Sequence, residues 1–104
     1  MRMLHIRLAV LTMLAVATAA AQTTDPNLAR NLAATCANCH GTQGVSQGGI
    51  ESLAGMAKAT MISKLQEFKS GARPASIMHQ LSKGYTDEQL ALIAGWFSEQ
   101  KAPK

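Results

Sequence analysis

Aromatic residues are scarce in this chain of 104 residues: one Trp, one Tyr and two Phe make up 4% of it. A domain of this size buries a modest fraction of its surface, and such chains often depend on a metal, disulfides or a cofactor for stability. With so few large apolar side chains available, a large apolar prosthetic group would complete the core.

Cysteine is equally scarce. The chain has only Cys36 and Cys39, and two residues separate them. A disulfide between them would close a very short loop and would stabilise the fold little. The stabilising element of this domain is therefore of another kind.

A strong charge imbalance is also missing. Ten Lys and Arg residues face six Asp and Glu residues, a formal net charge of +4, and the basic residues form no cluster. Recognition of nucleic acid needs a basic stripe or patch. We therefore expect no nucleic-acid partner.

The first residues have the layout of a secretory signal. Arg2 and Arg7 precede an apolar run at residues 8–16, and small residues follow at 17–21. The alternative is a membrane anchor, which needs roughly 20 apolar residues, more than this run supplies. We expect residues 1–21 to be a signal peptide, cleaved before Gln22, and residues 22–104 to be one exported, periplasmic domain with no stable membrane span.

No segment of residues 22–104 alternates apolar and polar residues as a strand does, so the expected fold class is all-α. The spacing of apolar residues predicts four helices, which we place from residue 26 into the cysteines, at 57–70, at 76–81 and from 87 onward.

Capping residues define the helix ends. Asp25 precedes Pro26 as a cap of the first helix, Gly71 ends the second, and Thr86 with Gln89 fits a capping box. Gly95 lies inside the last helix, where glycine costs about 1 kcal/mol relative to alanine. It either permits the close approach of another helix or is a tolerated surface glycine. The expected buried face of this helix comprises Leu90, Ile93, Ala94 and Phe97.

The chemistry of the chain is concentrated in the sequence Cys-Ala-Asn-Cys-His at residues 36–40. A histidine directly after a Cys-x-x-Cys pair is typical of c-type haem attachment. Residues three apart on a helix share a face, so Cys36 and Cys39 can form thioethers at the two vinyl-bearing positions along one haem edge. His40 then turns its imidazole toward the iron as the proximal ligand, and neutral imidazole suits iron.

Two other readings of the cysteines are weaker. A structural zinc site needs four ligands, and beyond Cys36, Cys39 and His40 only His79 remains in residues 22–104. A thioredoxin-like redox pair lies near a βαβ pattern, and no strand is predicted here.

The second axial ligand has several candidates. Methionine is usual in cytochromes c, and the chain offers Met56, Met61 and Met78. Met61 falls in the apolar stripe of the second helix and reads as core filling, while Met56 follows His40 closely. We favour Met78, which precedes the last helix and can approach from the opposite haem face. His79 is a rival for bis-histidine ligation, although a surface imidazole is its expected role.

These motifs resemble a class I monohaem cytochrome c over nearly all of residues 22–104. The resemblance rests on the Cys-x-x-Cys-His-Gly motif, Gly44, the Leu-Ala-Gly turn at 53–55, the helix end at 68–71 with Arg73, Met78, and the aromatic pair Trp96 and Phe97. It implies three to four helices wrapped around one covalent haem c, with Cys36 and Cys39 attached to it, and His40 and Met78 as iron ligands. Such a protein transfers electrons and is not itself an enzyme.

Residues 77–89 are also similar to the cytochrome subunit of flavocytochrome c sulfide dehydrogenases. This resemblance implies a redox partner that carries FAD and oxidises sulfide. The alternative is a free carrier like cytochromes c5 and c4, which deliver electrons to a terminal oxidase or reductase. A haem sensor or enzyme with an open sixth site is a third reading.

One segment departs from the family. Many members have a proline after the glycine-rich loop, in the region whose carbonyl bonds the proximal histidine, whereas Ile50, Glu51 and Ser52 stand here. The residues therefore do not identify the partner of the second His40 nitrogen. Three lysines, Lys58, Lys64 and Lys69, are spaced along one helix side and either steer an acidic partner or only aid solubility. We expect the binding cavity to be lined by Cys36, Cys39, His40, Leu53 and Met78.

Overall fold

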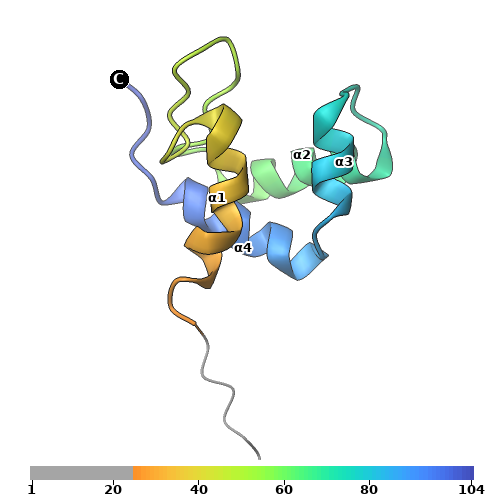
Figure 1. Ribbon diagram of the computed structural model, residues 1–104, viewed down its shortest axis with the longest axis horizontal. Coiled ribbons are helices and arrows are strands. Elements are labelled where there is room, and N and C mark those ends of the chain that lie inside the picture. The colour runs from red at the N-terminus through yellow and green to blue at the C-terminus, as the bar shows by residue number, and fades with distance from the viewer. Residues whose placement is uncertain (1–24) are drawn as a thin grey trace, which may run out of the picture.

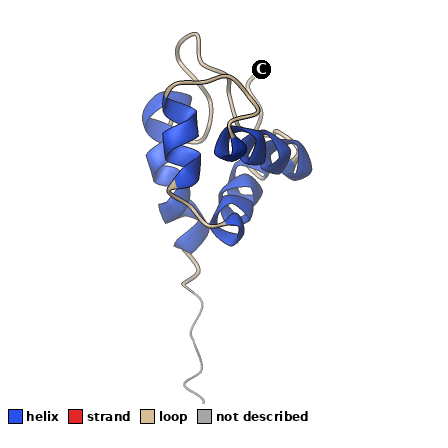
Figure 2. Ribbon diagram, turned by 90° about the vertical axis from the view of Figure 1, so that its right-hand side faces the viewer, coloured by secondary structure: helices blue, strands red, loops and turns tan. Residues whose placement is uncertain are grey.

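The computed structural model describes residues 25–104, so the predicted signal peptide at residues 1–21 lies outside the described part (Figure 1). The described residues form four helices and no strand (Figure 2), which confirms the all-α prediction. The helices are α1 (Leu28–His40), α2 (Lys58–Ser70), α3 (Ile77–Lys83) and α4 (Asp87–Ser98). Within residues 25–104, none of the helices has the length and hydropathy needed to cross a bilayer.

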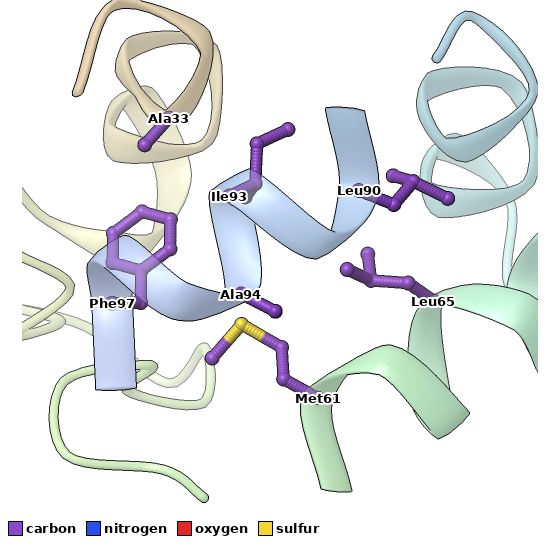
Figure 3. Close-up of a cluster of buried hydrophobic side chains, with 7 residues drawn as sticks. All are labelled: Ala33, Met61, Leu65, Leu90, Ile93, Ala94 and Phe97. Atoms are coloured by element: carbon purple, nitrogen blue, oxygen red, sulfur yellow. The ribbon is translucent and has the colours of Figure 1, made fainter. Parts of the chain in front are cut away.

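Helix α4 is the centre of the fold. Its predicted capping box is present: Gln89 N–H donates to Thr86 Oγ1 at 3.1 Å, and Thr86 N–H donates to Gln89 Oε1 at 2.9 Å. All four residues of its predicted inner face are buried, and Ala94 and Phe97 are fully inaccessible. Figure 3 shows α1 and α2 packing on this helix through the side chains Ala33, Met61 and Leu65.

Helix α1 begins later than predicted. Asp25 Oδ1 accepts a hydrogen bond from Asn27 N–H at 2.8 Å, and this turn carries Pro26 and Asn27, so Asn27 precedes the first helical residue. Leu28, the first residue of α1, is 39% exposed, whereas Ala33 is buried. Helix α3 also starts one residue late and continues two residues beyond the predicted end.

The glycine-rich connection between α1 and α2 is fastened to the end of α4. The carbonyl of Gly44 accepts hydrogen bonds from the N–H groups of Leu53 and Ala54, and Gly55 N–H donates to the Phe97 carbonyl. Gly44 has φ +80°, and a Cβ there would lie 2.7 Å from Cδ1 of Phe97. Only glycine fits this position, and the loop is held where its tip can reach the end of α1.

Gly95 does not admit a neighbouring helix backbone. The atoms nearest to a Cβ at this position would be those at the end of the Lys58 side chain, at 3.6 Å, an ordinary van der Waals distance. The prediction of a close helix approach at Gly95 is therefore wrong, because the flexible side chain of Lys58 covers it.

A polar clamp joins α2 to the start of α4. The Asp87 carboxylate accepts hydrogen bonds from Gln66 Nε2 and from Lys69 Nζ, both at 3.0 Å, and Lys69 Nζ also donates to the Tyr85 carbonyl at 2.7 Å. The Gln66 amide, followed by the Lys69 ammonium, holds the pKa of Asp87 below its ordinary value.

This clamp predicts a pH-dependent stability. A carboxyl group whose pKa is lowered in the folded state contributes stability above its unfolded pKa of about 3.9, and that contribution is lost as the pH falls through the folded pKa. We expect Asp87→Asn to lower the urea midpoint at pH 7 and to match the unmodified protein at about pH 2. Glu88→Gln is the control, since it removes a charge from the same helical turn without touching Lys69. An equal loss at both pH values in Asp87→Asn would contradict the prediction.

Candidate functional site

The two cysteines lie on the last turn of α1. Cys36 is half-buried, Cys39 is exposed, and both are free thiols. Burial raises the pKa of the Cys36 thiol, which keeps it neutral beside apolar neighbours. The helix ends directly after His40, because the backbone of Gly41 has φ +93°, which is not helical. Only glycine fits here, since any Cβ would collide with the Val45 carbonyl.

Two adjoining cavities open beside this turn, with volumes of about 180 and 80 Å³. Both are bordered by the same five side chains, which are Cys36, His40, Leu65, Met78 and Ile93. Cys39 lines the larger cavity and Leu53 the smaller. The lining expected from the sequence is thereby confirmed, although it is divided between two adjoining spaces.

The cavity walls come from distant parts of the chain. Cys36 and His40 belong to α1, Met78 belongs to α3, and Leu65 and Ile93 form the floor from α2 and α4. In Figure 1, α1 and α3 stand apart, with α2 and α4 running between them. The imidazole and the candidate thioether therefore reach the same space from different walls.

His40 is held by the loop that lacks the family proline. Its Nδ1 lies 2.6 Å from the backbone carbonyl oxygen of Glu51. A carbonyl oxygen only accepts, so Nδ1 carries the proton and Nε2 keeps its lone pair for a metal. The Glu51 carbonyl is the partner that the sequence did not identify.

The methionine candidates differ in position. Met61 is 3% exposed and belongs to the core, as predicted. Met56 and Met61 line only the smaller cavity, whereas Met78 lines both, as His40 does. His79 lines neither of these cavities. Its Nε2 bonds the backbone carbonyl of Arg73, and the ring is half-buried rather than on the surface as expected.

Ser82 is a residue that the sequence analysis missed. It lies on α3 four residues after Met78, is 1% exposed and borders the larger cavity. Its Oγ has no hydrogen-bond partner among the described residues, although a helical serine commonly bonds the carbonyl four residues back. An unpaired buried hydroxyl costs about 1–3 kcal/mol. Its spacing of four residues from Met78 could have predicted it, because residues four apart on a helix share a face.

A haem fits these residues. The space is apolar, two thiols border it on one helical turn, and an imidazole with its Nε2 lone pair available stands beside them. The unpaired Ser82 hydroxyl indicates that the protein-only core is incomplete at this point. Within residues 25–104, no group of three or more His, Cys, Asp and Glu side chains lies close enough to hold a bare metal ion.

The four-helix fold and this cavity define a small c-type cytochrome. The chain belongs to the cytochrome c family, whose sequence model matches residues 27–100. It is accordingly an electron carrier, and the Cys-x-x-Cys pair implies a covalently bound haem c.

Particular relatives are similar over about two thirds of the chain. The cytochrome subunit of sulfide dehydrogenase from Chlorobaculum tepidum is 41% identical over 66 residues, which cover 64% of this chain and 60% of that protein. The thiosulfate dehydrogenase electron acceptor of Stutzerimonas stutzeri is 33% identical over 65% of this chain and 32% of its own length. Cytochrome c-554(548) of Halomonas halodenitrificans is 32% identical over 64% of this chain and 86% of its own length. The chain thus spans less than two thirds of the first two relatives.

Proposed function

We propose that this protein is the haem subunit that accepts electrons from a flavoprotein sulfide dehydrogenase in the periplasm. In this proposal Cys36 and Cys39 form the two thioethers, His40 is the proximal iron ligand and Met78 the distal one. The observation that carries the assignment is that His40 and Met78 border both cavities from different walls.

The bound haem would supply a one-electron couple, and the chain would set its surroundings. The Glu51 carbonyl binds Nδ1 of His40, which borders the cavity, and so leaves Nε2 available to bind the iron. Leu65, Leu90 and Ile93 exclude water from the floor of the site. An iron bound by both His40 and Met78 would have no open coordination position for a small molecule. The protein would therefore pass electrons rather than transform a substrate.

The rim of the larger cavity supports a stable protein partner. Ile50 and Ile77, 47% and 63% exposed, border this cavity together with the exposed Cys39. Stable subunit interfaces are richer in apolar area than transient ones. Exposed isoleucines around the entrance are therefore consistent with a permanent flavoprotein contact.

Electrostatic steering has less support than the sequence suggested. Lys64 pairs with Glu51 at 2.6 Å and Lys69 pairs with Asp87 at 3.0 Å, while the Lys58 chain lies over Gly95. Two of the three lysines are thus neutralised by partners in the same chain. The 41% identity to a sulfide dehydrogenase cytochrome subunit also supports a flavoprotein as the partner.

The alternative is a free-standing carrier like cytochromes c5 and c4. One observation favours it: the similar region accounts for 86% of the Halomonas cytochrome c-554(548). In either case we propose export by residues 1–21 and a mature domain at residues 22–104.

Capture of the partner tests the proposal. We expect the tagged, haem-loaded protein to retain a flavin-containing protein from periplasmic extract. The mass of the cytochrome itself should correspond to a chain that starts at Gln22. Ile77→Lys should weaken this capture about tenfold, equal to about 1.4 kcal/mol, because it places a charge in an apolar contact. Leu92→Lys is the matched control, since Leu92 is 40% exposed and borders neither cavity. Recovery of the loaded cytochrome alone would support the free carrier instead.

A further inference from the structure

Glu51 contacts two different helices through two different groups. Its backbone carbonyl accepts the hydrogen bond from His40 Nδ1 at 2.6 Å. Its side-chain Oε1 pairs with Lys64 Nζ of α2, also at 2.6 Å. One residue of the loop therefore joins the imidazole at the end of α1 to a cation on another helix.

We propose that the Lys64–Glu51 ion pair is a positioning device, which holds the Glu51 carbonyl against His40 and thereby sets the reduction potential of the bound haem. This inference rests on the proposed ligation of iron by His40. Lys64 is then a positioning residue that acts through Glu51 and His40.

The backbone bonds that fasten this loop to α4 come after Glu51, at Gly55, so the stretch before Glu51 needs a fastening of its own. Gly48 and Gly49 have no atoms within 4 Å of the place where a Cβ would stand, and Ile50 is 47% exposed, so little packing fixes the chain before Glu51. No proline restricts the backbone at residues 50–52. On the other side, Ser52 Oγ accepts from Ser46 N–H at 2.9 Å, which closes the loop on itself without attaching it to a helix.

Lys64 is suited to this role by its burial. Its side chain is 27% exposed, and both Lys64 and Glu51 border the smaller cavity beside His40. Lys64 belongs to α2, so the contact of its Nζ with Glu51 Oε1 ties this part of the loop to that helix. An ion pair of this exposure contributes little to global stability, which leaves its effect on the carbonyl as the principal consequence.

The sign of the effect follows from the hydrogen bond. A carbonyl that accepts from Nδ1–H raises the basicity of the imidazole, and a more basic ligand favours the ferric state. Loosening this bond should therefore favour reduction. Removing only one charged partner would confuse this effect with a change in local charge, so the pair must be removed together.

The test is the double variant Glu51→Gln with Lys64→Met in the haem-loaded protein. It leaves the net charge unchanged. We expect the equilibrium constant for reduction to rise two- to threefold, about 18–28 mV at 59 mV per tenfold. Hydrogen exchange at His40 Nδ1–H, followed by NMR in the reduced state, should become at least tenfold faster. The single variant Lys64→Arg keeps a cation at the same place. Its equilibrium constant for reduction and its exchange rate at His40 Nδ1–H should therefore match those of the unmodified protein.

The chain offers a matched control. The Lys69–Asp87 pair also joins α2 to another part of the chain, with side-chain exposures of 30% and 66% against 27% and 57% for Lys64–Glu51. Lys69→Met with Asp87→Asn should leave potential and exchange unchanged, because neither residue borders the two cavities. Wild-type values in the Glu51/Lys64 variant, or equal shifts in both double variants, would overturn the inference. Failure of the proposed ligation would be recognised separately, because the unmodified protein would then lack the NMR shifts of an iron-bound His40 imidazole.

Discussion

Replacing both Cys36 and Cys39 by serine is expected to abolish covalent haem attachment and, with it, cooperative folding. The only two cysteines of the chain border the larger cavity on one helical turn, and they are not joined to each other by a disulfide. Serine keeps nearly the same shape but cannot form the thioether. Mass spectrometry of the double variant should therefore find the bare chain, with covalently bound haem below about one tenth of the wild-type content.

The loss of folding follows from the composition of the core. Leu65, Leu90 and Ile93 belong to the buried cluster and also border the larger cavity. Without the bound group the apolar lining of this cavity loses the contacts that a haem would give it, at about 25 cal/mol for each Å² of apolar surface left uncovered. A small domain has only a few kcal/mol of net stability to lose. Urea titration of the double variant should show a broad, non-cooperative loss of helix.

The single variants are the controls for this result. Cys36→Ser and Cys39→Ser each retain one thiol, and each should carry haem through one thioether and keep a cooperative transition at lower urea. A double variant that still carries haem of full mass after denaturing extraction would exclude the cysteines as attachment points.

The last helix was predicted correctly because its signals are local. The Thr86 and Gln89 side chains that cap it lie three residues apart, and its buried face repeats every three to four residues. Nothing outside this segment is needed to place either feature. The start of α1 was missed although its signal is equally local, since Asp25 caps an isolated turn as readily as the first turn of a helix.

The positions of Cys36, Cys39 and His40 at the cavity were predictable from the motif, whereas the support of His40 was not. Every residue has a backbone carbonyl, so the identity of Glu51 says nothing about where its carbonyl points. That direction depends on the contacts of Leu53 with Gly44 and on Lys64, thirteen residues away. The lysines show the same limit of local reasoning, because the partner of Lys69 lies eighteen residues further on.

Substitution of Met78 by alanine is expected to change the ferric spectrum from low-spin to high-spin. Met78 is the methionine that borders both cavities with His40, and methionine ligation raises the potential of cytochromes c. Its loss should lower the equilibrium constant for reduction about a hundredfold or more, roughly 120 mV at 59 mV per tenfold. The ferrous variant should also bind carbon monoxide, because a coordination position becomes open.

Met56→Ala is the matched control for this substitution. Met56 borders only the smaller cavity, so its removal should leave the low-spin spectrum and the potential nearly unchanged. An unchanged low-spin spectrum in Met78→Ala would remove Met78 from its proposed role. Ready binding of carbon monoxide by the unmodified ferrous protein would instead favour a sensor or enzyme with an open site. Carbon monoxide titration of the ferrous unmodified protein and of ferrous Met78→Ala therefore separates the three cases. An electron carrier ligated by Met78 binds the gas only in the variant, a sensor or enzyme with an open site binds it in both proteins, and a carrier with another iron ligand binds it in neither.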